Sequence, residues 1–103
     1  MDKSYALDCV RRYSDVVRAN MNVDKIILFG SYAKNTASID SDIDVAVVID
    51  NFTQDWLSTS ANLYKLRRNI DLSIEPVLLD SRDNTTGFLD EILRTGEIIY
   101  QKN

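Results

Sequence analysis

Two short polar motifs carry the side chains of this sequence that are best suited to chemistry. Gly30-Ser31 ends one apolar run, and Asp42-Ile43-Asp44 begins another after ten intervening residues. In a strand, residues two apart point to the same face with their Cα atoms about 7 Å apart. Asp42 and Asp44 are therefore expected side by side, where two negative charges repel unless a cation joins them. Magnesium fits, because it accepts a few carboxylates and completes its coordination with water and phosphate oxygens.

The Gly30-Ser31 motif predicts a phosphate-binding turn. Glycine permits a backbone conformation that a side chain would obstruct, and Ser31 offers both its N–H and its hydroxyl group. A helical turn that starts here would direct the positive end of its dipole at an anion. Lys34 is either a further phosphate ligand or a solvated surface lysine. A phosphate-binding turn near paired carboxylates suits a nucleoside triphosphate bound through its magnesium.

The composition excludes several other kinds of chemistry and bounds the class of protein. The 103 residues include no histidine and one cysteine, which excludes Ser/His or Cys/His nucleophile pairs and the usual zinc sites. The formal net charge of -4 argues against a broad nucleic-acid-binding surface. The length predicts a single domain over residues 1–103. Without an apolar membrane span or signal region, and with Cys9 unable to form an internal disulfide, we expect a cytoplasmic protein.

Hydrophobic spacing predicts the elements that position these motifs. The first half of the chain is expected to form a helix at residues 4–20 and strands at residues 25–29 and 43–49. A helix capped by Thr53 should follow, end near residues 65–68 and lead to a strand at residues 70–79. The last elements are a helix that starts at Thr85 or Thr86 and is closed by Gly96, and a short strand at residues 98–100. Pro76 lacks an N–H, so it favours an edge strand or a bulge. The fold class is therefore α/β (α+β), a small mixed sheet of three or four strands covered by helices.

The residues of these two motifs resemble the nucleotidyltransferase signature of polymerase-beta-like enzymes. The match consists of Gly30-Ser31, the ten-residue spacing, and Asp42-Ile43-Asp44 followed by apolar residues. The length and the Gly-Ser-Tyr-Ala-Lys start look most like the minimal nucleotidyltransferases, which are small single-domain proteins of bacteria and archaea. This resemblance implies the nucleotidyltransferase fold. At residue 35 the family often has glycine, but the asparagine found here also tolerates a left-handed backbone.

The resemblance implies a third carboxylate on the next strand of the sheet. Asp71 and Glu75 are the candidates, and they share a face with Ser73 if the strand is regular. Glu75 is favoured because it opens an apolar run at about the family's usual distance before the last helix, and Asp71 stays the alternative. The implied catalytic and metal-binding residues are Asp42, Asp44 and Glu75.

The mechanism and the partner are likewise implied by the resemblance. The three carboxylates hold two Mg²⁺ ions, and Gly30 and Ser31 bind the phosphates of ATP or another nucleoside triphosphate. The product is a nucleoside monophosphate attached to a hydroxyl acceptor. Because so small a domain has little surface for recognising the acceptor, we expect a partner to supply it. In the family this partner is often a helical HEPN-type toxin that the nucleotidyltransferase, as antitoxin, adenylylates; a homo-oligomer stays open.

Other interpretations remain beside this one. The chain could be a non-catalytic module of the same fold that regulates a partner by contact. Transfer to a small molecule such as an aminoglycoside is disfavoured, because the chain lacks the extra domain that usually completes such a site. A calcium loop starting at Asp40 fails, because Val45 stands where an EF-hand needs glycine. One basic cluster is either a helix terminus or a binding surface for RNA or an acidic partner: Lys65, Arg67 and Arg68.

Overall fold

Over residues 2–50, 52–83 and 85–103, which the computed structural model describes, the chain forms three helices and one four-stranded sheet. The elements are α1 (Lys3–Asn20), β1 (Lys25–Phe29), β2 (Ile43–Ile49), α2 (Trp56–Leu66), β3 (Ile74–Asp80), α3 (Phe88–Thr95) and β4 (Glu97–Gln101). Their order confirms the predicted succession of helices and strands. None of the helices in these three stretches is long and apolar enough to cross a membrane.

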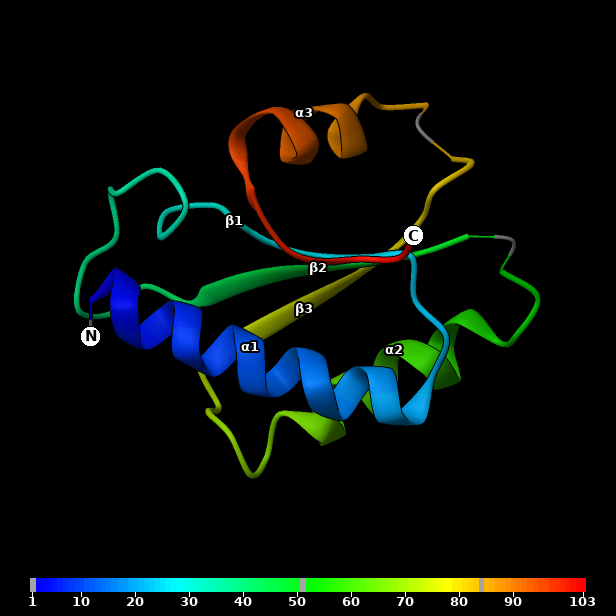
Figure 1. Cartoon of the computed structure of the whole chain (residues 1–103), viewed down its shortest axis with the longest axis horizontal. Helices are drawn as coiled ribbons and strands as arrows, with labels where there is room; N and C mark the ends of the chain where they lie inside the picture. Colours follow the sequence, from blue (N-terminus) through cyan, green and yellow to red (C-terminus); the bar gives the residue numbers. More distant parts are fainter. Residues whose placement is uncertain (1, 51, 84) are drawn as a thin grey trace.

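The sheet is mixed, with the strand order β3-β2-β1-β4. β1 pairs antiparallel with both β2 and β4, whereas β2 and β3 are parallel. Parallel neighbours need a crossover connection, which α2 provides here. α1 and α2 cover one face of the sheet, and α3 covers the other (Figure 1). The predicted α/β class is therefore confirmed.

The side chains of β2 alternate between two hydrophobic clusters, because successive residues of a strand point to opposite faces. Ile43 and Val45 belong to the larger cluster, which includes residues of α1 and α2. Ala46 and Val48 belong to the smaller cluster with two buried residues of α3. Asp44 has the same parity as Ala46, so it lies on the face that carries α3.

Two helices begin at other residues than those predicted. α2 is capped by Asp55, whose carboxylate accepts from the N–H of Ser58 at 3.1 Å, and Thr53 lies outside the helix. α3 begins after Gly87, which has a left-handed φ of 75°. In both segments several residues of the capping type follow one another, so residue type alone does not determine which of them caps the helix.

β3 begins at Ile74, four residues later than predicted. The chain before it forms a turn, in which the N–H groups of Ile70 and Asp71 both donate to the carbonyl of Arg67 at 3.0 Å. Pro76 lies in this strand at the edge of the sheet, as predicted. An edge strand tolerates proline, because only one of its sides is hydrogen-bonded to another strand. The missing N–H of the proline can face the other, unpaired side.

Candidate functional site

Gly30 and Asp44 are in direct contact at one end of the sheet. Phe29, the last residue of β1, pairs with Asp44, so Gly30 follows beside that carboxylate. A Cβ atom added to Gly30 would lie 2.2 Å from Asp44 Oδ2, and the φ of Gly30 is 74°. Both the close approach and the left-handed backbone require glycine at this position. The antiparallel pairing therefore brings the two sequence motifs together.

The turn that follows Gly30 has the dimensions of one helical turn. The N–H of Lys34 donates to the carbonyl of Gly30 at 3.1 Å, and the N–H of Thr36 donates to that of Ser31 at 2.9 Å. Asn35 has a φ of 60°, the left-handed conformation that asparagine was expected to tolerate. The side chain of Lys34 is exposed. Phosphate binding by Ser31 and Lys34 stays a prediction.

Three carboxylates influence one another at this end of the sheet. Asp44 and Glu75 are register partners in the parallel pair of β2 and β3, and Asp42 lies immediately before β2. Burial raises the pKa of Asp44, and the negative charges of Asp42 and then of Glu75 raise this pKa further. None of the ion pairs in the part of the chain that the structure describes includes any of the three. Their mutual repulsion is therefore uncompensated by protein cations.

The oxygen atoms of Asp42, Asp44 and Glu75 are of the type that a hard divalent cation prefers, although the three side chains do not form a closed cluster. Among residues 2–50, 52–83 and 85–103, no three His, Cys, Asp or Glu side chains converge closely enough to hold a metal ion. The candidate donors are all carboxylate oxygens, which magnesium prefers. A bound cation would also relieve the repulsion that raises the pKa of Asp44. The assignment of Asp42, Asp44 and Glu75 as metal ligands stays a prediction.

Asp71, the alternative third carboxylate, lies in a different environment from Glu75. It precedes β3, so it does not share a strand face with Glu75. Its carboxylate accepts from the Tyr5 hydroxyl of α1 and, at 2.7 Å, from the N–H of Ser73. These hydrogen bonds, that of Tyr5 first, lower the pKa of Asp71. Asp71 therefore joins α1 to the turn before β3, and its alternative role as the third carboxylate stays a prediction.

Tyr64 of α2 is a neighbour of the site that the sequence did not reveal. Its hydroxyl donates to Glu75 Oε2 at 3.1 Å, and the guanidinium carbon of Arg67 lies 4.9 Å from the centre of its ring. Desolvation and then the hydrogen bond to Glu75 raise the pKa of Tyr64, so its hydroxyl remains a donor at neutral pH. Helical spacing alone gives Tyr64 no role beyond that of an aromatic residue in the core or at an interface. The contact between Tyr64 and Glu75 depends on β3 lying at the edge of the sheet beside α2. The sequence around Tyr64 does not predict this arrangement.

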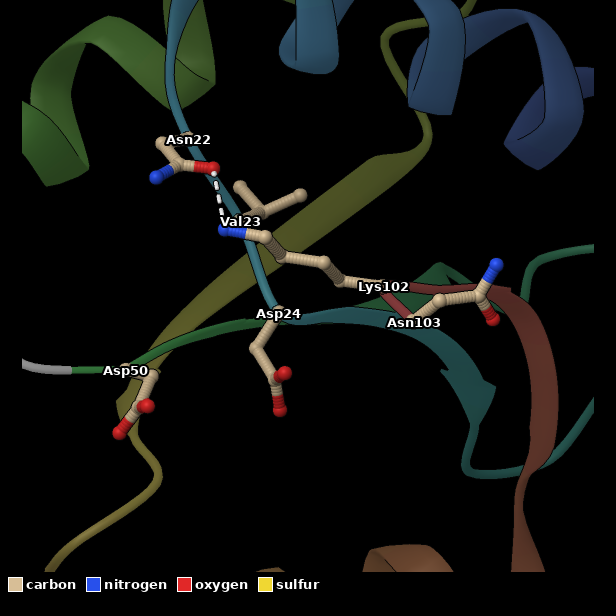
Figure 2. Close-up of a pocket in the computed structure, with 6 residues that line it drawn as sticks. All are labelled: Asn22, Val23, Asp24, Asp50, Lys102 and Asn103. Carbon is tan, nitrogen blue, oxygen red and sulfur yellow. Dashed lines mark hydrogen bonds between the residues drawn. The ribbon is translucent and has the colours of Figure 1, made fainter.

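A cavity of about 500 Å³ lies at the opposite end of the sheet (Figure 2). Asp24 directly precedes β1 and Asp50 directly follows β2, so both stand at the other ends of the strands from Gly30 and Asp44. The residues that line the cavity are Asn22, Val23, Asp24, Asp50, Lys102 and Asn103. None of the predicted site residues is among them. The cavity is therefore separate from the candidate site.

Residues 12–103 match a family model that is described as polymerase beta, nucleotidyltransferase. This match includes both sequence motifs and all the candidate carboxylates. No curated protein matches the chain.

Several solved structures share the fold. A Sulfolobus solfataricus protein, described provisionally as a nucleotidyltransferase, superposes with a TM-score of 0.72 at 18% identity, covering 97% of this chain and 84% of that chain. A tri-AMPylated Shewanella oneidensis HEPN toxin in complex with its MNT antitoxin gives a TM-score of 0.64 at 24% identity, with coverages of 97% and 73%. A toxin–antitoxin structure with AMP-PNP gives 0.64 at 24% identity, with coverages of 90% and 74%. These similarities confirm the predicted nucleotidyltransferase fold.

Proposed function

The chain belongs to the polymerase beta nucleotidyltransferase family, and from this membership we propose that it transfers the nucleoside monophosphate of a triphosphate to a hydroxyl group of a partner protein, with release of pyrophosphate. The observation that supports this most directly is the contact of Gly30 with Asp44 beside Glu75. It brings a turn suited to phosphates next to carboxylates suited to magnesium. ATP is the expected donor, because a solved relative of the same fold contains AMP-PNP.

Each residue of the site has a defined role in this proposal. Gly30 lets the chain turn beside Asp44, and Ser31 offers its N–H and hydroxyl to the outer phosphates. Asp42, Asp44 and Glu75 would hold two magnesium ions, which supply positive charge to the triphosphate and lower the pKa of the attacking hydroxyl. Rotation of the Asp42 and Asp44 side chains toward Glu75 would gather the three carboxylates, because neighbouring strands lie about 4.8 Å apart. Residues 1–103 would act as one domain.

We propose a helical HEPN-type protein as the acceptor, with this chain as its antitoxin. The solved Shewanella oneidensis complex of an AMPylated HEPN toxin with an MNT antitoxin supports this choice, since the fold is shared. The partner would then supply both the acceptor hydroxyl and much of the specificity.

Transfer can be tested with ATP labelled at the α-phosphate, magnesium and the product of the neighbouring gene. We expect label on the partner, and a rate about 10³-fold lower for Asp44→Asn, because metal-assisted charge stabilisation contributes several kcal/mol. Asp80→Asn is the matched control, since Asp80 lies at the far end of the sheet, and it should transfer label at the wild-type rate. The absence of label with every nucleotide and partner would contradict the proposal.

A second candidate is a non-catalytic module that neutralises its partner by contact. The observation that favours it is the lack of a closed metal-binding cluster in the described residues. The two functions differ in one measurement. If the double variant Asp42→Asn, Asp44→Asn still neutralises the partner in cells while it no longer transfers label, contact is sufficient.

A further inference from the structure

We infer that Tyr64 is a positioning residue, whose hydroxyl holds the Glu75 carboxylate in place for binding a divalent cation beside Asp44. The inference rests on the proposed function, because it concerns the same carboxylate site. It assigns a role to a residue on α2, an element that contributes none of the predicted ligands.

The hydrogen bond from Tyr64 can orient the Glu75 carboxylate and still leave most of its lone pairs free to bind a cation. Tyr64 donates one hydrogen bond, 3.1 Å long, to Oε2 of Glu75. An ionised carboxylate has about four lone-pair sites on two oxygens, so most of its capacity remains available to a cation. A glutamate side chain that is already held loses less conformational entropy when the cation binds. Hydrogen bonds to metal ligands from surrounding residues commonly have this effect.

Arg67 holds both the aromatic ring and the backbone next to Glu75. Its guanidinium carbon lies 4.9 Å from the ring centre of Tyr64, within the range of cation–π attraction of about 6 Å. Its Nη1 donates to the carbonyls of Leu72 and Ile74, both at 2.8 Å. Ile74 directly precedes Glu75. The planar guanidinium group of Arg67 therefore fixes both the Tyr64 side chain, which donates to Glu75, and the backbone next to Glu75.

The position of Tyr64 argues for orientation of Glu75 rather than for stability. α2 covers the same face of the sheet as α1 (Figure 1), and its Leu63 belongs to the larger core cluster. Asp44 lies on the opposite face, because it has the same parity in β2 as Ala46 of the smaller cluster. Tyr64 reaches Glu75 at β3, which is the edge strand. The Tyr64 side chain is 40% exposed, and an exposed hydrogen bond of this kind contributes little to folding. Removing the hydroxyl should therefore change cation binding much more than stability.

The affinity of the full chain for Mn²⁺, measured by electron paramagnetic resonance, tests the inference without requiring catalysis. Mn²⁺ takes the same oxygen ligands as magnesium and is directly visible. Tyr64→Phe should bind Mn²⁺ about tenfold more weakly than wild type, with an unchanged urea midpoint because the ring and its contact with Arg67 remain. Glu75→Gln should bind at least as weakly as Tyr64→Phe. Adding Tyr64→Phe to Glu75→Gln should have no further effect.

Tyr5→Phe is the matched control, because it removes an equivalent hydrogen bond from tyrosine to carboxylate, at Asp71. Its affinity for Mn²⁺ should equal that of wild type. If Glu75→Gln weakens binding and Tyr64→Phe does not, the inference is wrong while the proposed site stands. If Glu75→Gln binds Mn²⁺ as tightly as wild type does, Glu75 is not a metal ligand, and the inferred role of Tyr64 is wrong as well. Weakening by Tyr5→Phe alone would assign the third carboxylate to Asp71.

Discussion

The carboxylates of the candidate site differ in their ion pairing from two carboxylates at the opposite end of the sheet. At the end away from the candidate site, Asp24 pairs with Lys25 at 2.8 Å and Asp80 pairs with Arg82 at 3.3 Å. At the site end, Asp44 takes part in none of the ion pairs found in the described stretches. Asp80 at one end of β3 is therefore paired with a cation, whereas Glu75 near the other end of β3 and its register partner Asp44 are in no such pair within the described residues. The site end does hold a paired carboxylate, Glu97 of β4, which pairs with Lys3.

This difference appears in the direction of the pKa shifts. Hydrogen bonds from Arg82 lower the pKa of Asp80, so the fold favours its charged form. Burial and the charges of Asp42 and Glu75 raise the pKa of Asp44, so the fold disfavours its charged form. A fold that retains such repulsion is expected where a ligand of opposite charge is to bind. The comparison thus separates a carboxylate whose charged form the fold favours, Asp80, from one whose charged form it disfavours, Asp44.

Among the variants that test this comparison, Gly30→Ala is expected to lower the free energy of unfolding most. Gly30 and Gly87 have nearly the same φ, 74° and 75°, but only Gly30 has Asp44 in the space of the missing Cβ. Alanine at Gly87 should destabilise the fold by about 1–2 kcal/mol through backbone strain alone. Alanine at Gly30 should cost about 2–4 kcal/mol, because Asp44 must also move. Urea unfolding of both variants measures the two values.

The difference between these two variants isolates the contact with Asp44. Gly30→Ala should also abolish transfer, whereas Gly87→Ala should retain it, since nothing lies within 4 Å of its added Cβ. Equal destabilisation by both substitutions would mean that Asp44 moves aside freely. In that case the close approach would not define the site.

Local sequence signals were sufficient for the part of the site that consists of Gly30, Asp42 and Asp44. A glycine that ends a buried strand and an Asp-x-Asp that begins another are both short-range features, and the antiparallel pairing then joins them. The left-handed conformation of Asn35 is one that its residue type tolerates. The roles of these residues toward metal and phosphate stay predictions.

Long-range contacts account for what the sequence could not predict. The strand expected from residue 70 begins at Ile74, because Ile70 and Asp71 lie in a turn, where Asp71 also accepts from the Tyr5 hydroxyl, 66 residues away in the chain. The contact between Tyr64 and Glu75 depends on α2 lying beside the edge strand β3. Neither contact has a periodic or compositional signal, because both depend on how distant elements pack.

A second, smaller effect is expected at Tyr32, in the turn beside the site. Its hydroxyl is buried and has no hydrogen-bond partner in the described part of the chain, and the residue is only 2% exposed. Tyr32→Phe should therefore raise the free energy of unfolding by about 1 kcal/mol, since it removes an unsatisfied polar group. Tyr13→Phe is the matched control: its buried hydroxyl donates to the Leu63 carbonyl at 2.7 Å, so its loss should destabilise by about 1 kcal/mol. Destabilisation by both variants in urea would show that Tyr32 has a partner.

The smallest effect, but the most direct test of the comparison, is the pH dependence of Asp44→Asn and Asp80→Asn. Because the folded state raises the pKa of Asp44 above its ordinary value of 3.8, wild type loses stability as the pH rises above that value. Asp44→Asn should thus be more stable than wild type at pH 7, because it removes a carboxylate whose charged form the fold disfavours. This gain should disappear below about pH 3.8, where Asp44 is protonated in both folded and unfolded states.

Asp80→Asn should behave in the opposite way. The lowered pKa of Asp80 means that its contribution is present above pH 3.8 and is lost as the pH falls through the folded-state value. Asp80→Asn should therefore be less stable than wild type at pH 7, and the two proteins should converge in acid. Urea midpoints between about pH 3 and pH 7 measure both differences. If both variants shift in the same direction at pH 7, the two ends of the sheet do not differ in electrostatic compensation, and the unpaired charge of Asp44 no longer argues for a cation.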